Sequence, residues 1–369
     1  MNTDFIPTNC RLLAGLTFLI SVLGLSTAKA DNLPVISGTG VVEVQNEFAT
    51  DSDNSAADEQ NNLFLRSELA PRVTLNKHFS MSGVFVLEPV QAFDAGEDNA
   101  FEEQGVFVEE INLSYSQGPV TLKAGKFNPG FGIAWEPGRG IWGEDFAEDY
   151  EIAEKIGGAV SYELAQSVPG THTLTASTFF SDTSFLSHSA PTGRGPVDEE
   201  DGGAANTQDF SSYVLGLQGQ NTGGVEGLYY KLAYRDLARG DAAVQAGGDD
   251  EQGLIATLGH RIELAESGHV DGLLEYTEID NFDAGPNDRD YLTASLDATI
   301  RDHWLITASY TARDTDVAGT GERDDHLLQL SGGYDFGNGL TLEVGWRNSE
   351  TAGVDTDIIG GLARYNISF

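Results

Sequence analysis

The stretch that decides the fold is Leu340-Thr-Leu-Glu-Val-Gly-Trp-Arg347, followed after a short polar break by Ile359-Gly-Gly-Leu-Ala-Arg-Tyr-Asn-Ile-Ser-Phe369. In both segments, apolar residues alternate with polar or small ones. Successive side chains of a β-strand point to opposite faces, so each segment has one apolar face and one polar face. The sequence therefore predicts two strands of about 10 residues, the length that a tilted strand needs to cross a membrane.

The first thirty residues have the pattern of a targeting segment. Arg11 precedes an apolar run from Leu12 to Leu25, and the Ala-Lys-Ala at 28–30 fits a cleavage site. This arrangement predicts a secretory signal peptide over residues 1–30, because the alternative, a membrane anchor, needs a longer apolar run. Cys10, the only cysteine, lies in this segment. Disulfides, thiolate metal sites and cysteine nucleophiles are therefore not expected in the mature chain.

The charge of the chain excludes one class of function. It has 20 Lys and Arg residues against 58 Asp and Glu residues, a net charge of −38. Binding to nucleic acid would need the opposite sign. After residue 30 no apolar run is long enough for a membrane helix. A hydrophobic content of 40% suits a soluble enzyme or a β-barrel, since half of each barrel strand faces water.

Two kinds of connection alternate strictly along the chain. Short polar breaks, such as 76–78 and 337–339, alternate with long acidic segments, such as 182–209. This asymmetry is typical of membrane barrels and not of a soluble sandwich. The sequence thus predicts an all-β fold over residues 31–369, a transmembrane antiparallel β-barrel of about 16 strands with short periplasmic turns and long extracellular loops. The expected strands lie near 39–48, 62–76, 79–90, 104–117, 119–127, 153–165, 171–181, 210–220, 226–237, 253–264, 268–279, 289–300, 303–314, 325–336, 339–349 and 358–369.

The two faces of the expected strands differ in chemistry. One face is apolar, with Trp304, Ile306 and Tyr310 in strand 303–314. The other face collects charges, which are costly next to lipid, so it predicts a wet interior. These charges either only neutralise one another or form a field that sorts solutes by charge. His260 falls on the apolar face, which indicates a bulge or a shifted register. The expected pore-lining residues are Arg66, Glu68, Arg72, Lys123, Lys155, Lys231, Arg235, Arg261, Arg313, Arg347 and Arg364.

The third long connection, residues 129–152, differs from the others because it contains five aromatic residues. A loop in water has little use for aromatic rings, whereas a loop folded against a barrel wall can bury them. We therefore expect this loop to fold inward and constrict the channel. The alternative is an ordinary loop packed over the end of the barrel. The residues expected to form the constriction are Trp135, Glu136, Arg139, Trp142, Glu144, Asp145, Glu148 and Asp149.

The leader, the alternating loop lengths, the aromatic third loop and the terminal Phe369 together resemble the Gram-negative outer-membrane porin superfamily. The segment Lys123-Ala-Gly-Lys-Phe-Asn-Pro-Gly-Phe-Gly132 also resembles the Gly-x-x-x-x-Pro-Phe-Gly segment of phosphate-selective porins. It departs from that pattern because Gly130 stands where the proline belongs and Pro129 comes one residue early. The resemblance implies an outer-membrane location, contact with lipid and lipopolysaccharide, an inward third loop and a homotrimer.

These features predict a water-filled channel for passive diffusion of small hydrophilic solutes or ions, with no cofactor and no metal site. Inward Arg and Lys side chains favour anions, whereas the acidic third loop favours cations. A constriction dominates selectivity, so we expect a slight preference for cations. The alternatives are a substrate-specific uptake channel of the phosphate or siderophore type, and a surface barrel enzyme. No Gly-x-Ser-x-Gly segment supports the enzyme, and the seven histidines lack metal-site spacing.

Overall fold

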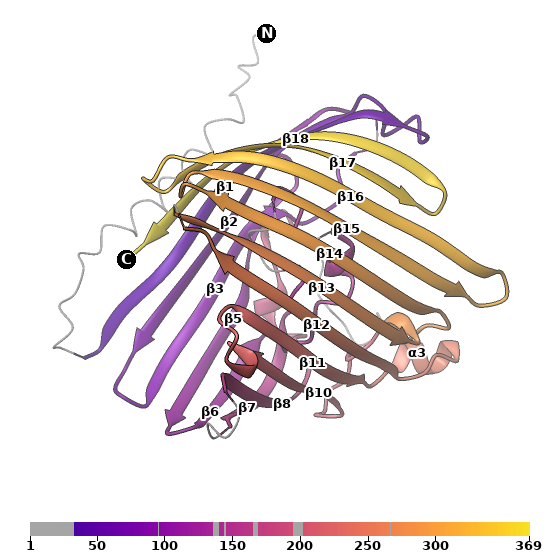
Figure 1. Cartoon of the computed structure of the whole chain (residues 1–369). Coiled ribbons are helices and arrows are strands. Elements are labelled where there is room, and N and C mark those ends of the chain that lie inside the picture. The colour runs from indigo at the N-terminus through magenta and orange to yellow at the C-terminus, as the bar shows by residue number, and fades with distance from the viewer. Residues whose placement is uncertain are drawn as a thin grey trace, which may run out of the picture.

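The computed structural model describes residues 33–94, 96–135, 140–143, 145–164, 169–194, 202–265 and 267–369. The expected signal peptide lies outside the described residues. The described chain forms one closed sheet of long, tilted strands around a lumen (Figure 1). No helix in this part of the chain is long and apolar enough to cross a membrane.

The barrel wall consists of 16 long strands, each antiparallel to its neighbours, and the predicted fold class is confirmed. The ring closes where β1 pairs with β18 between Thr39–Ser368 and Ser52–Thr356. The wall strands are β1 (Val35–Ser52), β2 (Asn61–Thr74), β3 (Phe79–Pro89), β5 (Gln104–Gln117), β6 (Val120–Phe127), β7 (Lys155–Glu163), β8 (Thr171–Ser181), β10 (Ser212–Gln220), β11 (Leu228–Leu237), β12 (Glu251–Glu263), β13 (Gly268–Asp280), β14 (Asp288–Ile300), β15 (Trp304–Val317), β16 (Gly321–Asp335), β17 (Leu340–Thr351) and β18 (Val354–Ser368).

The connections hold the remaining elements. Two very short strands add to the wall at the end of the barrel with the long loops: β4 (Asn99–Ala100) pairs parallel with β2, and β9 (Ala190–Pro191) pairs antiparallel with β5. The helical elements are α2 (Asp145–Glu148), α3 (Asp241–Ala246), η1 (Phe185–Ser187), η3 (Thr222–Gly224) and η4 (Phe282–Ala284). We call the two ends of the barrel the short-turn end and the long-loop end.

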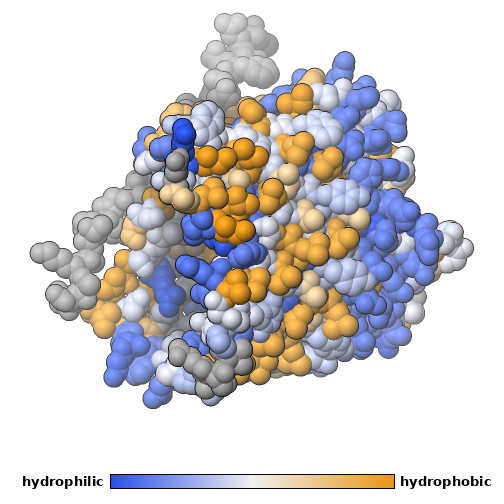
Figure 2. All heavy atoms as spheres, viewed as in Figure 1, coloured by the Kyte–Doolittle hydropathy of each residue, from blue (hydrophilic) through white to orange (hydrophobic). Residues whose placement is uncertain are grey.

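The outer face of the wall is apolar, as the alternation in the sequence predicts. Leu258, Leu274, Leu296 and Val344 point outward from different strands and are more than half exposed. Figure 2 shows the apolar residues as a band across the strands, with hydrophilic residues gathered where Figure 1 places α3 and the long loops. A band of this kind, bounded by polar surface, is what a barrel wall needs to contact lipid.

The register expectation at His260 is wrong. Strand β12 pairs with β11 and β13 without interruption through this residue, opposite Leu228 and Gly272. His260 stays on the outward side near the short-turn end, where its ring Nε2 lies 3.2 Å from the carbonyl oxygen of Glu226. A polar residue on the outward face is tolerated there because it lies near the edge of the apolar band.

We predict that Leu274→Arg, on the outward face of β13, lowers the free energy of unfolding in lipid bilayers by about 2–4 kcal/mol, because the guanidinium would face hydrocarbon. Leu274 is 51% exposed. The measurement is urea-induced unfolding in vesicles. Gln218→Arg is the control, since Gln218 points into the lumen. Equal effects of the two substitutions would contradict the assignment of the faces.

Candidate functional site

The connection between β6 and β7, residues 128–154, runs inside the barrel rather than over its end. We call residues 129–152 the inner loop. Phe131 and Tyr150 are completely buried, and Trp142 is 4% exposed. The loop contacts two separate parts of the inner wall, one formed by β11 to β15 and one formed by β1 and β16 to β18.

The first attachment is centred on Glu275 of β13, whose side chain is almost fully buried. Its carboxylate accepts hydrogen bonds from the backbone N–H groups of Ile133 and Ala134, at 3.0 and 3.1 Å. It also accepts the hydroxyls of Tyr150, at 2.8 Å, and Thr257, at 2.6 Å. Four donors satisfy a buried carboxylate whose desolvation would otherwise be costly. Burial, followed by the charge of Glu275, raises the pKa of the Tyr150 hydroxyl, which therefore stays protonated and donates.

Arg235 of β11 holds the start and the end of the inner loop together. Its guanidinium donates to the carbonyl oxygen of Tyr150 at 2.8 Å and lies 4.5 Å from the ring centre of Phe131. It also forms a 2.6 Å ion pair with Glu251. Gly253 lies beneath this contact, and a Cβ there would be 3.1 Å from the Phe131 ring. Arg235 is therefore occupied with packing the loop and does not face open water.

A second ionic contact fixes the end of the inner loop. Asp149 accepts hydrogen bonds from Arg289, Tyr291 and Arg313 at 3.0, 2.9 and 2.7 Å. Arg313 also pairs with Asp325 at 2.7 Å. Because the aspartate bridges β14 and β15, it fixes the loop to the wall, and its charge is balanced by the arginines that surround it.

The opposite attachment is made by Trp142. Its indole Nε1 donates to Glu47 of β1 at 2.6 Å, and its backbone carbonyl accepts the side-chain amide of Gln329 at 2.6 Å. The ring lies against the wall where β17 and β18 carry Gly345 and Gly360. A Cβ on Gly360 would approach the indole to 2.3 Å, so this position admits only glycine without displacement of the ring.

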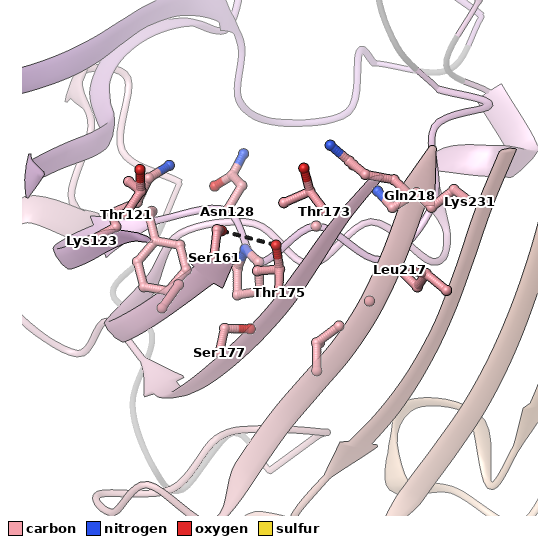
Figure 3. Close-up of a pocket in the computed structure, with 16 residues that line it drawn as sticks. Thr121, Lys123, Asn128, Ser161, Thr173, Thr175, Ser177, Leu217, Gln218 and Lys231 are labelled. Atoms are coloured by element: carbon pink, nitrogen blue, oxygen red, sulfur yellow. Dashed lines mark hydrogen bonds between the residues drawn. The ribbon is translucent and has the colours of Figure 1, made fainter. Parts of the chain in front are cut away.

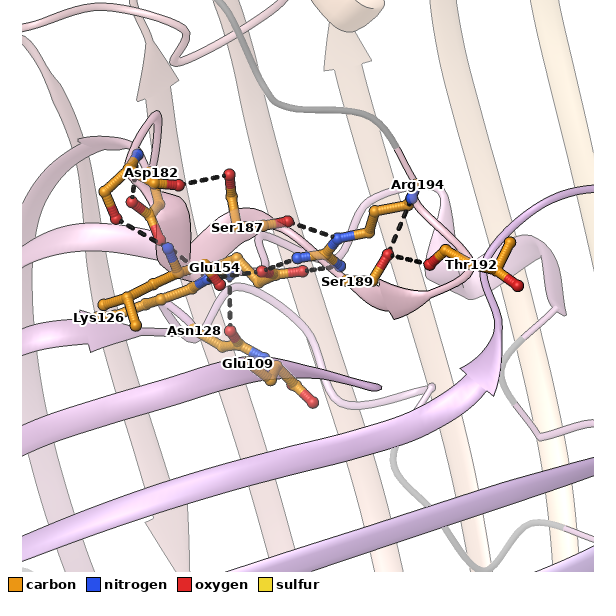
Figure 4. Close-up of polar contacts among 11 residues, drawn as sticks. Glu109, Lys126, Asn128, Glu154, Asp182, Ser187, Ser189, Thr192 and Arg194 are labelled. Carbon is orange, nitrogen blue, oxygen red and sulfur yellow. Dashed lines mark hydrogen bonds and ion pairs between the residues drawn. The ribbon is translucent and has the colours of Figure 1, made fainter. Parts of the chain in front are cut away.

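A further ionic cluster lies where β6 ends and β7 begins (Figure 4). Glu154, at the start of β7, accepts Lys126 at 2.7 Å and a bidentate contact from Arg194. Lys126 also pairs with Asp182 at 2.9 Å. Arg194 belongs to the segment that carries β9, so this cluster ties that segment to β6 and to the start of β7. The same segment also pairs with β5 through β9. Asn128 continues the network, because its side chain accepts the N–H of Glu154.

The inner loop leaves a cavity of about 640 Å³ between itself and the wall formed by β1, β2, β3, β5 and β18. An adjoining cavity of about 330 Å³ shares Arg66, Glu88 and Glu148 with it. We call the two together the lumen cavity. Its carboxylates are Glu43, Glu47, Glu68, Glu88, Glu109, Glu148, Glu151 and Glu154. Its cationic residues are Arg66, Arg194, Arg347 and Arg364.

The balance of charge in the lumen cavity is negative, because carboxylates outnumber guanidinium groups by two to one. Two of the arginines are also held close to acids. Arg364 pairs with Glu43 and, at 3.3 Å, with Glu343, while Arg194 is held by Glu154. The walls of the lumen cavity therefore carry more negative than positive formal charge.

The structure separates the expected pore-lining residues into groups. Those that line the lumen cavity are Arg66, Glu68, Arg347 and Arg364. Lys123 and Lys231 line a different pocket. The residues engaged with buried partners are Lys155, which donates to Ser181, and Arg235 and Arg313. Arg72, which donates to Ser80, and Arg261, which pairs with Glu263, lie near the short-turn end.

The residues expected to form the constriction are also divided. Trp135 and Glu148 line the larger part of the lumen cavity, and Trp142 lines the smaller part. Asp149 turns away from the cavity toward β14 and β15. Glu136, Arg139 and Glu144 lie outside the described residues. Asp145 begins α2, and its side chain lies outside the described part.

Sequence reasoning did not single out several residues that shape the site. Glu275 has the inward parity of its strand, but nothing in the sequence marks it as the acceptor for the loop. Glu154 and Arg194 lie in or beside long connections, where the two-residue period gives no orientation. The one signal for the Trp142 contact is Gly345 and Gly360, two small residues on the polar faces of the final strands. Small residues on an inner wall admit a close-packed ring.

No protein-family model matches the chain, and no curated protein sequence matches it significantly. Solved structures do match. The outer membrane channel DcaP of Acinetobacter baumannii has a TM-score of 0.59 at 11% identity, over 93% of this chain and 100% of that one. OmpF of Salmonella typhi has a TM-score of 0.57 at 12% identity, over 90% and 98%. An anion-selective porin from Comamonas acidovorans has a TM-score of 0.52 at 12% identity, over 90% and 99%. At these identities, the likeness shows the fold.

We predict that Glu275→Gln releases the inner loop from β13. The amide NH2 of glutamine cannot accept hydrogen bonds, so some of the buried donors that now bind the carboxylate would lose their acceptor. Each unsatisfied buried donor costs about 1–3 kcal/mol. Hydrogen exchange of residues 131–135 and 147–152 should become much faster, while exchange in the wall strands stays slow. The control is Glu278→Gln, on the exposed outward face of the same strand. Unchanged exchange in the inner loop of Glu275→Gln would contradict the proposed attachment.

Proposed function

We propose that this protein is a porin-type channel of the Gram-negative outer membrane, through which small hydrophilic solutes or ions diffuse passively. The observation that carries the proposal is the polar lumen cavity, which lies inside a closed barrel with an apolar outer face. A barrel of about 16 strands is wide enough to enclose an aqueous channel. The likeness to solved channels and porins supports the same function.

The proposal extends to the surroundings of the barrel. The exposed apolar band supports contact with outer-membrane lipid, and the acidic long-loop end would face lipopolysaccharide. The proposal that three copies of the chain form a homotrimer rests on the resemblance to porins. The inner loop, with Trp135, Glu148 and Glu151 lining the lumen cavity, would be the constriction, since it is attached both to β13 and to β1.

We further propose that the channel prefers cations. Two of the basic residues that favoured anions in the sequence, Arg235 and Arg313, are engaged with the inner loop and with buried acids, so they contribute little field to the open space. The lumen cavity is lined by twice as many carboxylates as guanidinium groups. Solute and charge are closest at a constriction, and the carboxylates there should dominate selectivity.

Two alternatives compete with this proposal. A phosphate-selective channel is favoured by the sequence of Lys123–Gly132 and by the name of the anion-selective Comamonas porin, but the acidic lumen cavity opposes it. A surface barrel enzyme belongs to another functional class, and assays of hydrolysis on purified protein distinguish it from a channel. The matched structures that are named as channels or porins support the non-enzymatic function.

We predict discrete single-channel steps in a planar bilayer, with a reversal potential in a potassium chloride gradient of the sign that cation permeation gives. The physical reason is the negative charge that surrounds the lumen cavity. Correctly folded protein that conducts no current would contradict the channel. A reversal potential of the opposite sign would contradict the proposed selectivity and favour the phosphate-type alternative.

The matched variant replaces Glu148 and Glu151 of the inner loop by Gln. Two unit charges about 6 Å apart in water interact by roughly 0.7 kcal/mol, so each lost carboxylate should lower cation entry about threefold and raise anion entry about threefold. The ratio of cation to anion permeability should therefore fall roughly tenfold for each carboxylate. Glu278→Gln, on the outer face, is the control and should leave this ratio unchanged. An unchanged ratio in the double variant would show that these carboxylates do not govern permeation.

A further inference from the structure

The strands next to β5 are too short to cover its edge at the long-loop end of the barrel. Strand β5 has 14 residues, whereas β6 and β7 have 8 and 9. The ladder between β5 and β6 ends at the pair Ile111–Lys126, so residues 104–110 of β5 extend beyond it. An uncovered strand edge presents backbone N–H and C=O groups without partners. A segment that covers this edge is therefore part of the wall.

Residues 182–194, which follow β8, cover this edge, and we call them the cover segment. Their short strand β9 pairs with residues 105–106 of β5. Near β8, Asp182 pairs with Lys126 at 2.9 Å, and Lys126 also donates to the carbonyl oxygen of Leu186 at 3.0 Å. The cover segment therefore runs from β8 back to β5 past the end of β6 (Figure 4).

Arg194, in the cover segment, also lines the lumen cavity. Its guanidinium makes the bidentate contact with Glu154, and its Nε donates to the carbonyl oxygen of Ser187 at 2.8 Å. The guanidinium carbon lies 3.9 Å from the ring centre of Phe107 on β5. A planar guanidinium suits a carboxylate and an aromatic face together, whereas the ammonium of a lysine does not. Arg194 therefore holds the cover segment against the wall of the lumen cavity.

The ion pair between Arg194 and Glu154 also sets the charge that this part of the wall presents. The two side chains are 19% and 20% exposed, and both line the lumen cavity. Lys126, the second cation on Glu154, is 1% exposed and does not line the cavity. Loss of the Arg194 guanidinium would therefore make the cavity wall more negative by one charge. Glu148 and Glu151 of the inner loop line the same cavity, so Arg194 acts on the same solutes as they do.

Arg194 borders the lumen cavity and not the neighbouring pocket that contains Lys123 and Lys231. That pocket, of about 160 Å³, is formed by β6, β7, β8, β10 and β11 together with residues 127–130 (Figure 3). Neither Arg194 nor Glu154 lines it. A change of selectivity in an Arg194 variant would therefore report on the lumen cavity.

We propose that the cover segment is a second constricting element of the channel and that Arg194 determines how strongly the channel prefers cations. This inference rests on the proposed function. The positive charge of Arg194 limits the cation preference that the carboxylates of the inner loop create. Its contacts with Glu154 and Phe107 keep the cover segment in place, so the inner loop and the cover segment together bound the space through which solutes pass.

The test compares the full-length barrel with its Arg194→Gln variant in planar bilayers at low ionic strength. Loss of one positive charge should raise the ratio of cation to anion permeability by up to about tenfold. Loss of the bidentate contact and of the aromatic contact should also release the cover segment, so the single-channel conductance should rise and fluctuate. Arg239→Gln is the matched control, since Arg239 pairs with Asp249 in another long connection and does not line the lumen cavity.

Two further variants separate the charge of Arg194 from its role in positioning the cover segment. Arg194→Lys keeps the charge but not the bidentate contact, so its permeability ratio should stay near that of the wild type while its conductance fluctuates. Cysteines at positions 106 and 190, which are opposite each other in the β5–β9 ladder, would lock the segment. In the Arg194→Gln background, oxidation of this pair should quieten the conductance without restoring the ratio.

The outcomes distinguish this inference from the proposed function. A wild type that conducts no current would contradict the proposed function and this inference with it. A conducting wild type with the same permeability ratio and conductance as Arg194→Gln would contradict this inference alone. Equal changes of the ratio in Arg194→Gln and Arg194→Lys would show that the charge of Arg194 does not govern selectivity, which would also overturn the inference.

Discussion

Closure of the sheet is the constraint on which the rest of the structure depends. A strand that meets lipid has no water to satisfy its backbone N–H and C=O groups, so a β-structure in a membrane has to leave no free edge. The pairing of β1 with β18, the first and last wall strands, meets this requirement. Because the outer face then has to be apolar, nearly every charged side chain of the wall is directed inward or to the ends. The charged lumen is thus a consequence of closure and of the two-residue period together.

The inner loop decides what those inward charges can do. It is attached at Glu275 on one side and beside Glu47 on the other, so it crosses the lumen and divides it. The arginines nearest to the attachments form ion pairs and stack on aromatic rings. The carboxylates of β1 to β5 line the open cavity. On its other side, the loop covers a pocket with lysines and hydroxyls. One segment therefore borders two separate spaces inside the barrel.

The sequence predicted the strands of the barrel wall well, but it predicted fewer of the contacts inside the barrel. Alternation identified the strands and their outward faces, since a period of two residues fixes a face wherever one side is apolar. It did not give the height of a side chain along the barrel, so it could not show that Arg72 and Arg261 lie near the short turns while Arg66 and Arg364 line the lumen cavity. It also gave no partner for Glu154, because Lys126 and Arg194 approach it only once the chain has folded. His260 was misread as a break in register, since polarity alone does not distinguish an interruption from the edge of the apolar band.

The position of the inner loop within the barrel is tested most directly by disulfide trapping. A Cβ on Gly140 would lie 3.2 Å from the Cβ of Thr307 on β15, close to the separation that a disulfide requires. The variant with cysteines at positions 140 and 307 should cross-link rapidly under mild oxidation, whereas cysteines at 140 and 218 should not. The single Gly140→Cys variant controls for folding, since it carries the same backbone strain. Efficient cross-linking of the first pair is the result that the account predicts, and a folded barrel in which that pair stays reduced would contradict it.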